Sequence, residues 1–428
     1  MTHPSQEAYV PEGAAPASLW RDGDFLKLWA ALSISLMGSE ITALALPLLA
    51  VLTLEASPLQ MGLLAAAAQA PFFLFSLPAG VWADRVRRRP LLVATDLLSA
   101  ALLLWVPVAA MLGTLSITQL CLVAFGLGAL TVVGEVAHYA YAPGLIGRER
   151  LVAGNSIFQI SHSAAASAGP GLGGLLIQLF SAPVAVLVDA ASFLISALLV
   201  GLIARPEPVP ASTGQLARPL QAVREGLGAL LGHPLLRPII LIGSVANAFI
   251  NASVALYVIY LTRELGLGPA TIGLMFAVGG ACAIPGALLA AWAGRRFGVG
   301  PAIIGGWAIS GIARLLVPLA TGSPLAIVAT LVFAHALDGA AGTVANIHQW
   351  SLRQTVTPDA LQGRVTASHR FIVYGAGALG ALLGGSLGAL IGLRPALLLC
   401  TAGVLLTVLT LLASPLRGLR ELPQSRSL

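Results

Sequence analysis

The sequence predicts an all-α polytopic membrane protein with twelve transmembrane helices, arranged as two pseudo-symmetric six-helix halves. Its composition is the first reason, because 57% of the 428 residues are hydrophobic, 9% are charged and the mean hydropathy is +0.90. Soluble domains typically carry about 25% charged residues, and a soluble fold could not bury this much apolar surface. A series of long apolar segments and an internal repeat are the other two reasons.

Twelve apolar segments are long enough to cross a bilayer, for which about 20 residues are needed. Proline and glycine inside these segments do not exclude helices, because neighbouring helices in a bilayer can satisfy the freed backbone groups. The predicted spans lie near 27–53, 59–82, 91–113, 116–140, 153–178, 182–204, 236–261, 269–293, 299–320, 324–350, 362–390 and 393–413.

The chain also repeats itself. A shift of 211 residues takes Pro58 to Pro269, and the same shift takes Gly173 to Gly384. One constant shift that fits two distant helix pairs indicates two related halves, joined by the Pro-rich stretch RPEPVPASTGQLARP. The predicted divisions are a cytoplasmic tail at 1–24, a first half at 25–204, a cytoplasmic linker at 205–233, a second half at 234–415 and a tail at 416–428.

Lysine and arginine gather on one side of this predicted topology. Of the 23 such residues, all except Arg263, Arg314 and Arg394 fall in the tails, the linker, the even-to-odd loops or the ends of the spans beside them. Cytoplasmic loops of membrane proteins carry an excess of lysine and arginine, so we predict that both termini are cytoplasmic. The basic pI of 9.7 does not indicate a nucleic-acid partner, because the charges are scattered between apolar runs.

No motif in the chain indicates an enzyme. Cys121, Cys282 and Cys400 lie far apart in apolar segments, and the sequence contains neither a Walker A motif nor a cluster with metal-ligand spacing. GAGALG at 375–380 imitates part of a dinucleotide fingerprint, but it lies inside an apolar helix and no strand precedes it. We therefore expect no catalytic activity, no metal and no cofactor.

The stretch GVWADRVRRRP, residues 80–90, resembles the signature G-x-x-x-D-R-x-G-R-R of the major facilitator superfamily, which lies between helices 2 and 3. Arg87 stands where that family usually has glycine. The residues that match are Gly80, Asp84, Arg85, Arg88 and Arg89.

A second stretch, AGPGLGG at 168–174, resembles the G-P-x-x-G-G element of exporters in that superfamily. It contains Gly169, Pro170, Gly173 and Gly174, and small residues four apart allow close helix packing. PGLIGRERLVAGNS and TPDALQGRV are similar to the branch that holds macrolide-efflux proteins and siderophore exporters. The resemblance implies two halves that rock about a site at mid-depth between them.

Asp84 is a lone acid among arginines that serve as a topological anchor. In the superfamily, helix 2 lies beside helix 11 of the other half, so the resemblance implies that these charges meet the second half. We hypothesise a conformational latch on the cytoplasmic side, which holds the halves together while the site faces outward. Its members are Gly80, Asp84, Arg85, Arg88 and Arg89.

Spans 1, 4, 7 and 10 border the cavity in this superfamily, and on three of them, spans 4, 7 and 10, polar residues follow one another at helical spacing. A carboxyl group that is neutral when buried and titrates on contact with water suits a proton carrier, so Glu40, Glu135 and Asp338 are proton-coupling candidates. The alternative is that each acid is a hydrogen-bonded packing group. The substrate-cavity candidates are Met37, Thr131, Asn247, Asn251, Tyr257, His335 and Asn346.

Arg314 belongs to a helix on the outside of the superfamily layout, for which a supporting role is expected. The predicted function is export of an amphipathic small molecule, such as a drug, macrolide or siderophore, by proton antiport. We expect a monomer in the bacterial cytoplasmic (inner) membrane, with the substrate and the lipid as partners and the proton gradient as energy source. The alternatives are a uniporter, a lysolipid- or sugar-type carrier, and a membrane receptor or scaffold that does not transport.

Overall fold

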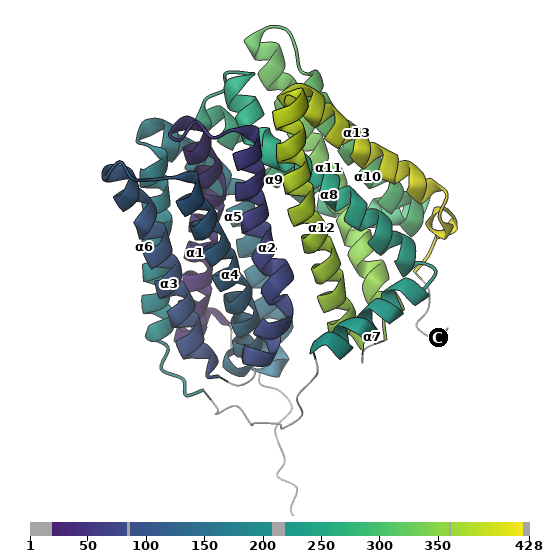
Figure 1. Cartoon of the computed structure of the whole chain (residues 1–428). Helices are drawn as coiled ribbons and strands as arrows, with labels where there is room; N and C mark the ends of the chain where they lie inside the picture. The colour runs from purple at the N-terminus through teal and green to yellow at the C-terminus, as the bar shows by residue number, and fades with distance from the viewer. Residues whose placement is uncertain (1–18, 84–85, 208–218, 359–360, 423–428) are drawn as a thin grey trace, which may run out of the picture.

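The computed structural model of the chain describes residues 19–83, 86–207, 219–358 and 361–422, and within these ranges it is helical (Figure 1). The main helices are α1 (Gly23–Leu52), α2 (Pro58–Ala83), α3 (Arg88–Met111), α4 (Ile117–Ile146), α5 (Leu151–Leu179), α6 (Ala182–Gly201), α7 (Pro219–Gly232), α8 (Leu236–Arg263), α9 (Pro269–Phe297), α10 (Val299–Leu319), α11 (Pro324–Val356), α12 (Gln362–Ile391) and α13 (Leu393–Leu412).

The fold is that of a polytopic membrane protein with two six-helix halves, as the sequence predicts. Helices α1–α6 form one group and α8–α13 the other, and the two groups stand side by side (Figure 1). Eleven helices of the described ranges are long and apolar enough to cross a membrane. The twelfth predicted span, α5, is equally long but rich in small and polar residues, and it packs against α1 and α9.

Local capping explains where several helices begin. The Asp22 side chain accepts hydrogen bonds from the backbone N–H groups of Asp24 and Phe25, which otherwise have no partner at the start of α1. Ser116 and Gln119 form a capping box at the start of α4. These polar caps explain why α1 and α4 begin within a few residues of the predicted spans.

The linker contains one helix that the sequence analysis did not predict. Helix α7 lies across the end of the second half, where it contacts α8 and α12 (Figure 1). Leu230 is buried, and Glu225 forms an ion pair with Arg364 of α12. Because α7 is too short to span a membrane, hydropathy does not single it out.

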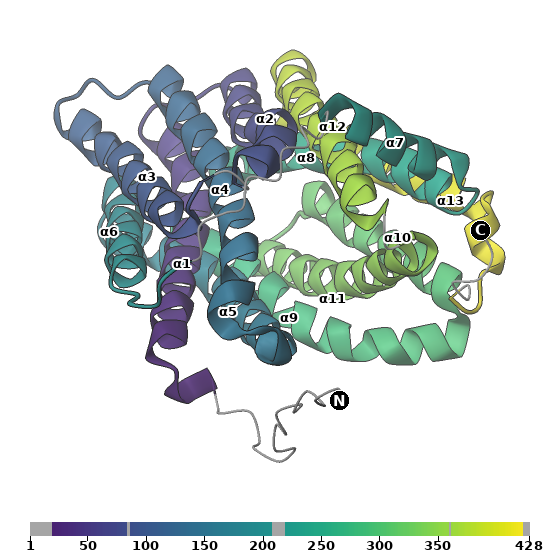
Figure 2. The same ribbon diagram turned by 90° about the horizontal axis from the view of Figure 1, so that it is seen from below.

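The two halves meet through glycines that the repeat relates to one another. A Cβ atom on Gly62 of α2 would lie 2.8 Å from the Cα atom of Gly385 of α12, and one on Gly273 of α9 would lie 2.9 Å from the Cα atom of Gly174 of α5. The pairs α2–α12 and α5–α9 are therefore equivalent crossings (Figure 2). Their close approach leaves no room for side chains at these four positions.

The hydrophobic core has a different organisation at the two ends of the molecule. At the end where α1 leads into α2, one cluster joins both halves and includes Leu49, Leu256, Ile272 and Leu393. At the other end, where α7 lies, each half has its own separate cluster. The halves are thus sealed together at one end and separately packed at the other.

Candidate transport site

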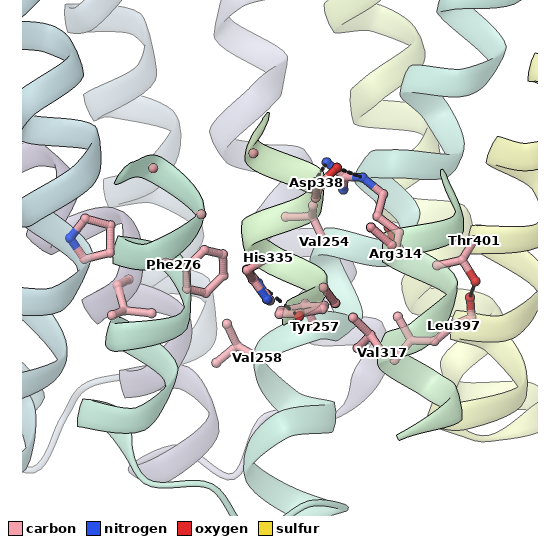
Figure 3. A pocket seen from close by; sticks show the side chains of 18 of the residues that line it. Val254, Tyr257, Val258, Phe276, Arg314, Val317, His335, Asp338, Leu397 and Thr401 are labelled. Carbon is pink, nitrogen blue, oxygen red and sulfur yellow. Dashed lines mark hydrogen bonds and ion pairs between the residues drawn. The ribbon is translucent and has the colours of Figure 1, made fainter. Parts of the chain in front are cut away.

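A central cavity of about 450 Å³ lies between the two halves and is lined mainly by the second half. Helix α1 contributes four lining residues, among them Glu40, and α5 contributes Pro170. Helices α8, α9, α10, α11 and α13 supply the remaining walls (Figure 3). Most lining residues are apolar, and the polar ones converge from α1, α8, α10, α11 and α13. This combination is typical of sites for amphipathic small molecules, whose volumes run from about 300 to 1,000 Å³.

An ion pair crosses the wall of this cavity from α10 to α11. The Arg314 guanidinium donates to both carboxylate oxygens of Asp338, with 2.8 Å between Nη2 and Oδ2 and 3.1 Å between Nε and Oδ1 (Figure 3). The Ser310 hydroxyl also donates to Oδ1. Both charges are therefore matched inside the second half, and Asp338 is not a free carboxylate in this arrangement.

An aromatic cluster lies beside the ion pair. His335 Nδ1 is 2.8 Å from the Leu331 carbonyl oxygen, so this nitrogen carries the proton in the neutral ring. Its Nε2 is then an acceptor for the Tyr257 hydroxyl, at 3.1 Å. Phe276 packs edge-on against both rings, with centroid distances of 5.8 Å to Tyr257 and 5.4 Å to His335 (Figure 3). Tyr257 and His335 thus form a fixed polar and aromatic face of the cavity.

Glu40 faces the cavity from the first half. It makes no hydrogen bond or ion pair with any residue in the described ranges, and His162 of α5 is the ionisable residue that lies near enough to interact with it through space. A Cβ atom on Gly169 would overlap the Cβ atom of Glu40, so the glycine provides the room that this acid occupies. The exporter-like stretch in α5 and the acid in α1 are therefore in direct contact.

Pro170, Gly173 and Gly174 extend this packing along α5. Pro170 lines the cavity, and a Cβ on Gly173 would lie 3.2 Å from the Cα atom of Ile41 in α1. Gly174 faces α9 of the other half. One side of the stretch therefore packs within the first half and the other side packs between the halves.

Two of the seven predicted cavity residues, Tyr257 and His335, line the central cavity in this conformation. The other five do not line it: Met37, Thr131, Asn247, Asn251 and Asn346. The Thr131 hydroxyl donates to the Leu127 carbonyl of its own helix. Asn247 and Asn346 line a second, smaller cavity in the second half. Asn251 accepts a hydrogen bond of 2.8 Å from Gln69 of α2, so it connects the two halves.

Glu135 of α4 also connects the halves. Its Oε2 atom is 3.3 Å from Nη1 of Arg370 in α12, and both side chains are 37% exposed. Close by, Phe72 stacks on Tyr374 and Phe73 packs on Phe371, which join α2 to α12. Glu135 is thus held in a cross-half ion pair and does not face the central cavity.

The predicted latch is only partly within the described residues, because Asp84 and Arg85 lie outside them. Gly80 lies in the last turns of α2. The backbone N–H groups of Arg88 and Arg89 donate to Glu207, at 2.7 and 3.1 Å, and the Arg89 side chain donates to the carbonyls of Val200 and Gly201 at the end of α6. These contacts stay within the first half and the start of the linker.

Comparison with known proteins decides the family. The family described as transmembrane secretion effector matches residues 14–427. The chain belongs to this family. It is therefore a major facilitator superfamily transporter of the branch that holds drug and siderophore exporters.

Two relatives from bacteria resemble this transporter along most of its length. The multidrug efflux pump Tap of Mycolicibacterium fortuitum is 29% identical over 411 residues, which cover 93% of this chain and 96% of Tap. The enterobactin exporter EntS of Escherichia coli O1:K1 is 26% identical over 372 residues, which cover 86% of this chain and 85% of EntS.

Solved structures share the fold of this transporter. A bacterial homologue of the iron transporter ferroportin in its inward-facing state superposes with a TM-score of 0.71, at 18% identity, over 92% of this chain and 99% of that one. The outward-facing state of a bacterial ferroportin homologue superposes with a TM-score of 0.58, at 16% identity, over 91% and 98% of the two chains.

Sequence reasoning missed two basic residues of the transporter. Arg314 was assigned a supporting role on an outer helix, yet it lines the central cavity and binds Asp338. The sequence did indicate this ion pair, because an arginine and an aspartate occur in two consecutive apolar spans. Arg370 was counted only as a cytoplasmic charge, although it is the partner of Glu135.

Proposed function

We propose that this transporter exports an amphipathic small molecule across the bacterial cytoplasmic membrane in exchange for protons, by alternating access between its two halves. The observation that carries the proposal is Glu40, an acid without a hydrogen-bonded or ion-paired partner among the described residues, which faces the cavity between the halves. The relatives Tap and EntS, a multidrug efflux pump and an enterobactin exporter by name, favour export and an amphipathic substrate.

The conformation fits an inward-facing stage of such a cycle. The halves share one hydrophobic core at the end opposite α7 and have separate cores at the end of α7. Between the glycine contacts and the end of the molecule where α7 lies, Ile160 of α5 is 68% exposed and Leu288 of α9 is 77% exposed, as expected where the two helices part. If both termini are cytoplasmic, as the distribution of arginines favours, the parted end faces the cytoplasm, and the higher TM-score to an inward-facing relative agrees.

Glu40 suits the exchange of a proton for a substrate. Asp338 is paired with Arg314, whereas no described residue balances the charge of Glu40 by a direct contact. When the cavity opens to water the carboxyl group can titrate, and when it closes the neutral form is favoured because a charge at mid-membrane is costly. An amphipathic substrate with a cationic group would compete with the proton for this acid.

The cycle that we propose needs no bound cofactor, metal or nucleic acid, because the proton gradient supplies the energy. The partners are the substrate and the surrounding lipid, and a single chain contains both halves of the cavity. Substrate and proton would bind alternately, each favouring one of the two orientations of the halves.

Transport in liposomes tests this proposal. The purified chain is reconstituted, the lumen is made acidic, and the accumulation of ethidium and of enterobactin is measured with and without the pH gradient. We expect gradient-driven accumulation of at least one of these probes in the wild type. In Glu40→Gln the accumulation that the pH gradient drives should fall about tenfold or more. Loss of one interaction of a charged group at a buried site typically has an effect of this size.

Glu55→Gln is the matched control, since Glu55 is an exposed acid in the loop between α1 and α2. It should transport like the wild type. The proposal is wrong if the pH gradient drives no flux of either probe in the wild type, or if Glu40→Gln retains the gradient-driven flux.

A further inference from the structure

The two equivalent crossings between the halves lie on opposite sides of the molecule (Figure 2). Along α2 and α12 the contact continues from the glycines toward the end where α7 lies. There Phe73 packs on Phe371 with 4.4 Å between the ring centroids, and Phe72 stacks on Tyr374 at 4.9 Å. Aromatic side chains therefore close this side of the interface.

The internal repeat identifies the corresponding positions at the other crossing. The shift of 211 residues takes Phe73 to Ile284 of α9, and it takes Ile160 of α5 to Phe371. Ile160 is 68% exposed and Ile284 is 58% exposed, whereas the two phenylalanines are half-buried. Isoleucine side chains that are so exposed are not packed on each other, so the α5–α9 crossing is open at the level where the α2–α12 crossing is closed.

The exposed side chains lie on faces that touch further along the same two helices. A Cβ atom on Gly280 of α9 would lie 2.8 Å from the Cα atom of Ser167 of α5, so the helices are in contact there. Ile284 and Leu288 follow Gly280 by four and eight residues, and Ile160 precedes Ser167 by seven. These spacings keep the side chains on the touching faces, so a gap opens between α5 and α9 toward the end where α7 lies.

The two walls of this gap differ in chemistry. On α5, Gln159 and Ser163 are exposed beside Ile160, and α5 is not among the helices found to be apolar enough to span the membrane. On α9, the wall consists of apolar side chains such as Ile284 and Leu288. Polar groups in an apolar medium cost free energy unless they form hydrogen bonds, so this gap suits a molecule with one polar and one apolar part.

The gap connects the outside of the bundle with the central cavity. The crossing of α5 and α9 lies at the edge of the molecule (Figure 2), where lipid surrounds a membrane protein. Gly280 lines the central cavity and also touches α5, and Pro170 lines the cavity one turn beyond Ser167. Because Gly280 has no side chain and that of Ser167 is small, little bulk separates the gap from the cavity.

We propose that the gap between α5 and α9 is a side entrance, through which an amphipathic amine dissolved in the cytoplasmic leaflet reaches the central cavity. This inference rests on the transport function and the orientation proposed above. The apolar body of the amine follows Ile284 and Leu288, while its charged end follows Ser163 toward Glu40. The opposite crossing stays closed by Phe73 and Phe371, so that entry is one-sided.

Photolabelling of the full chain in nanodiscs, without a pH gradient, tests the entrance. One probe is dodecylamine with a diazirine on its chain, which dissolves in lipid, and the other is benzylamine with the same group, which stays in water. Mass spectrometry locates the labelled residues. In the wild type we expect dodecylamine to label the cavity residue Tyr257 and to label Ile284 severalfold more than Phe73, its equivalent in the repeat.

The variant Ile160→Phe with Ile284→Phe copies the closed crossing onto the open side. Labelling of Tyr257 by dodecylamine should fall to background in this variant, whereas labelling by benzylamine should not change. The matched control is Leu172→Phe with Leu274→Phe, which enlarges two exposed side chains of the same helices. This control should be labelled like the wild type.

The entrance is refuted if dodecylamine does not label Tyr257 in the wild type, if the closing variant retains that labelling, or if both probes lose it equally. If the closing variant does not fold, equal labelling of Ile284 and Phe73 in the wild type refutes the proposal by itself. These measurements need no pH gradient, so a failure of proton-driven flux is recognised separately in the liposome assay.

Discussion

The ion pair between Arg314 and Asp338 permits a quantitative prediction. The distance from Nη2 to Oδ2 is 2.8 Å and that from Nε to Oδ1 is 3.1 Å. The side chains of Arg314 and Asp338 are 26% and 24% exposed. Exposed pairs contribute at most about 1 kcal/mol to stability, whereas removing one partner of a fully buried pair costs about 3–5 kcal/mol. For this partly buried pair we expect Asp338→Asn or Arg314→Gln alone to cost about 2 kcal/mol, and the double variant about 1 kcal/mol, because it leaves neither charge unmatched.

Thermal unfolding of the purified protein measures these differences. A change of 1 kcal/mol shifts Tm by about 2–4 °C in domains of 150–250 residues, so each single variant should lose several degrees and the double variant should regain part of the loss. The control is Arg364→Gln combined with Glu225→Gln, which removes an exposed pair and should leave Tm unchanged.

The same variants distinguish an ion pair from a proton carrier. If Asp338 only balances Arg314, the double variant should retain transport driven by the pH gradient. Single variants as stable as the wild type, together with a double variant that is no more stable than either, would refute the stability reasoning. Loss of gradient-driven transport in a well-folded double variant would refute the interpretation that Asp338 only balances Arg314.

Two further predictions concern contacts of the first half. Gly169→Ala should lower the free energy of unfolding by about 1–3 kcal/mol, because the added carbon overlaps Glu40. Thermal unfolding measures this loss. The control is Gly305→Ala, which has open space around it and should not lower Tm. Glu135→Arg should abolish transport in liposomes, because it places a second positive charge opposite Arg370 across the halves. The exchanged pair, Glu135→Arg with Arg370→Glu, should recover transport. Failure to recover would mean that the pair does not support transport.

Hydropathy was sufficient to predict most of the transmembrane helices, eleven of which in the described ranges are long and apolar enough to cross a membrane. A bilayer accepts only segments of about 20 apolar residues with internally satisfied backbones, so each span could be found without any tertiary contact. The repeat likewise predicted two related halves, and the related glycines Gly62, Gly174, Gly273 and Gly385 meet in two equivalent crossings. Helix α7 was not found because it lies across the end of the bundle, where length and hydropathy impose no such condition.

The partners of the polar residues could not be found in this way. Hydropathy places a side chain within a span but does not fix how the helix is rotated about its axis. This rotation brings Arg314 of α10 against Asp338 of α11. Glu135 and Arg370 are 235 residues apart and belong to different halves, so their contact depends on how the halves are oriented. Charge, apolar length and periodicity are local properties of a chain, whereas the balance of charges in a cavity arises only when the helices are packed. Glu40 was conspicuous in the sequence as an acid in a span, but only the packed structure shows that none of the described residues forms a hydrogen bond or ion pair with it.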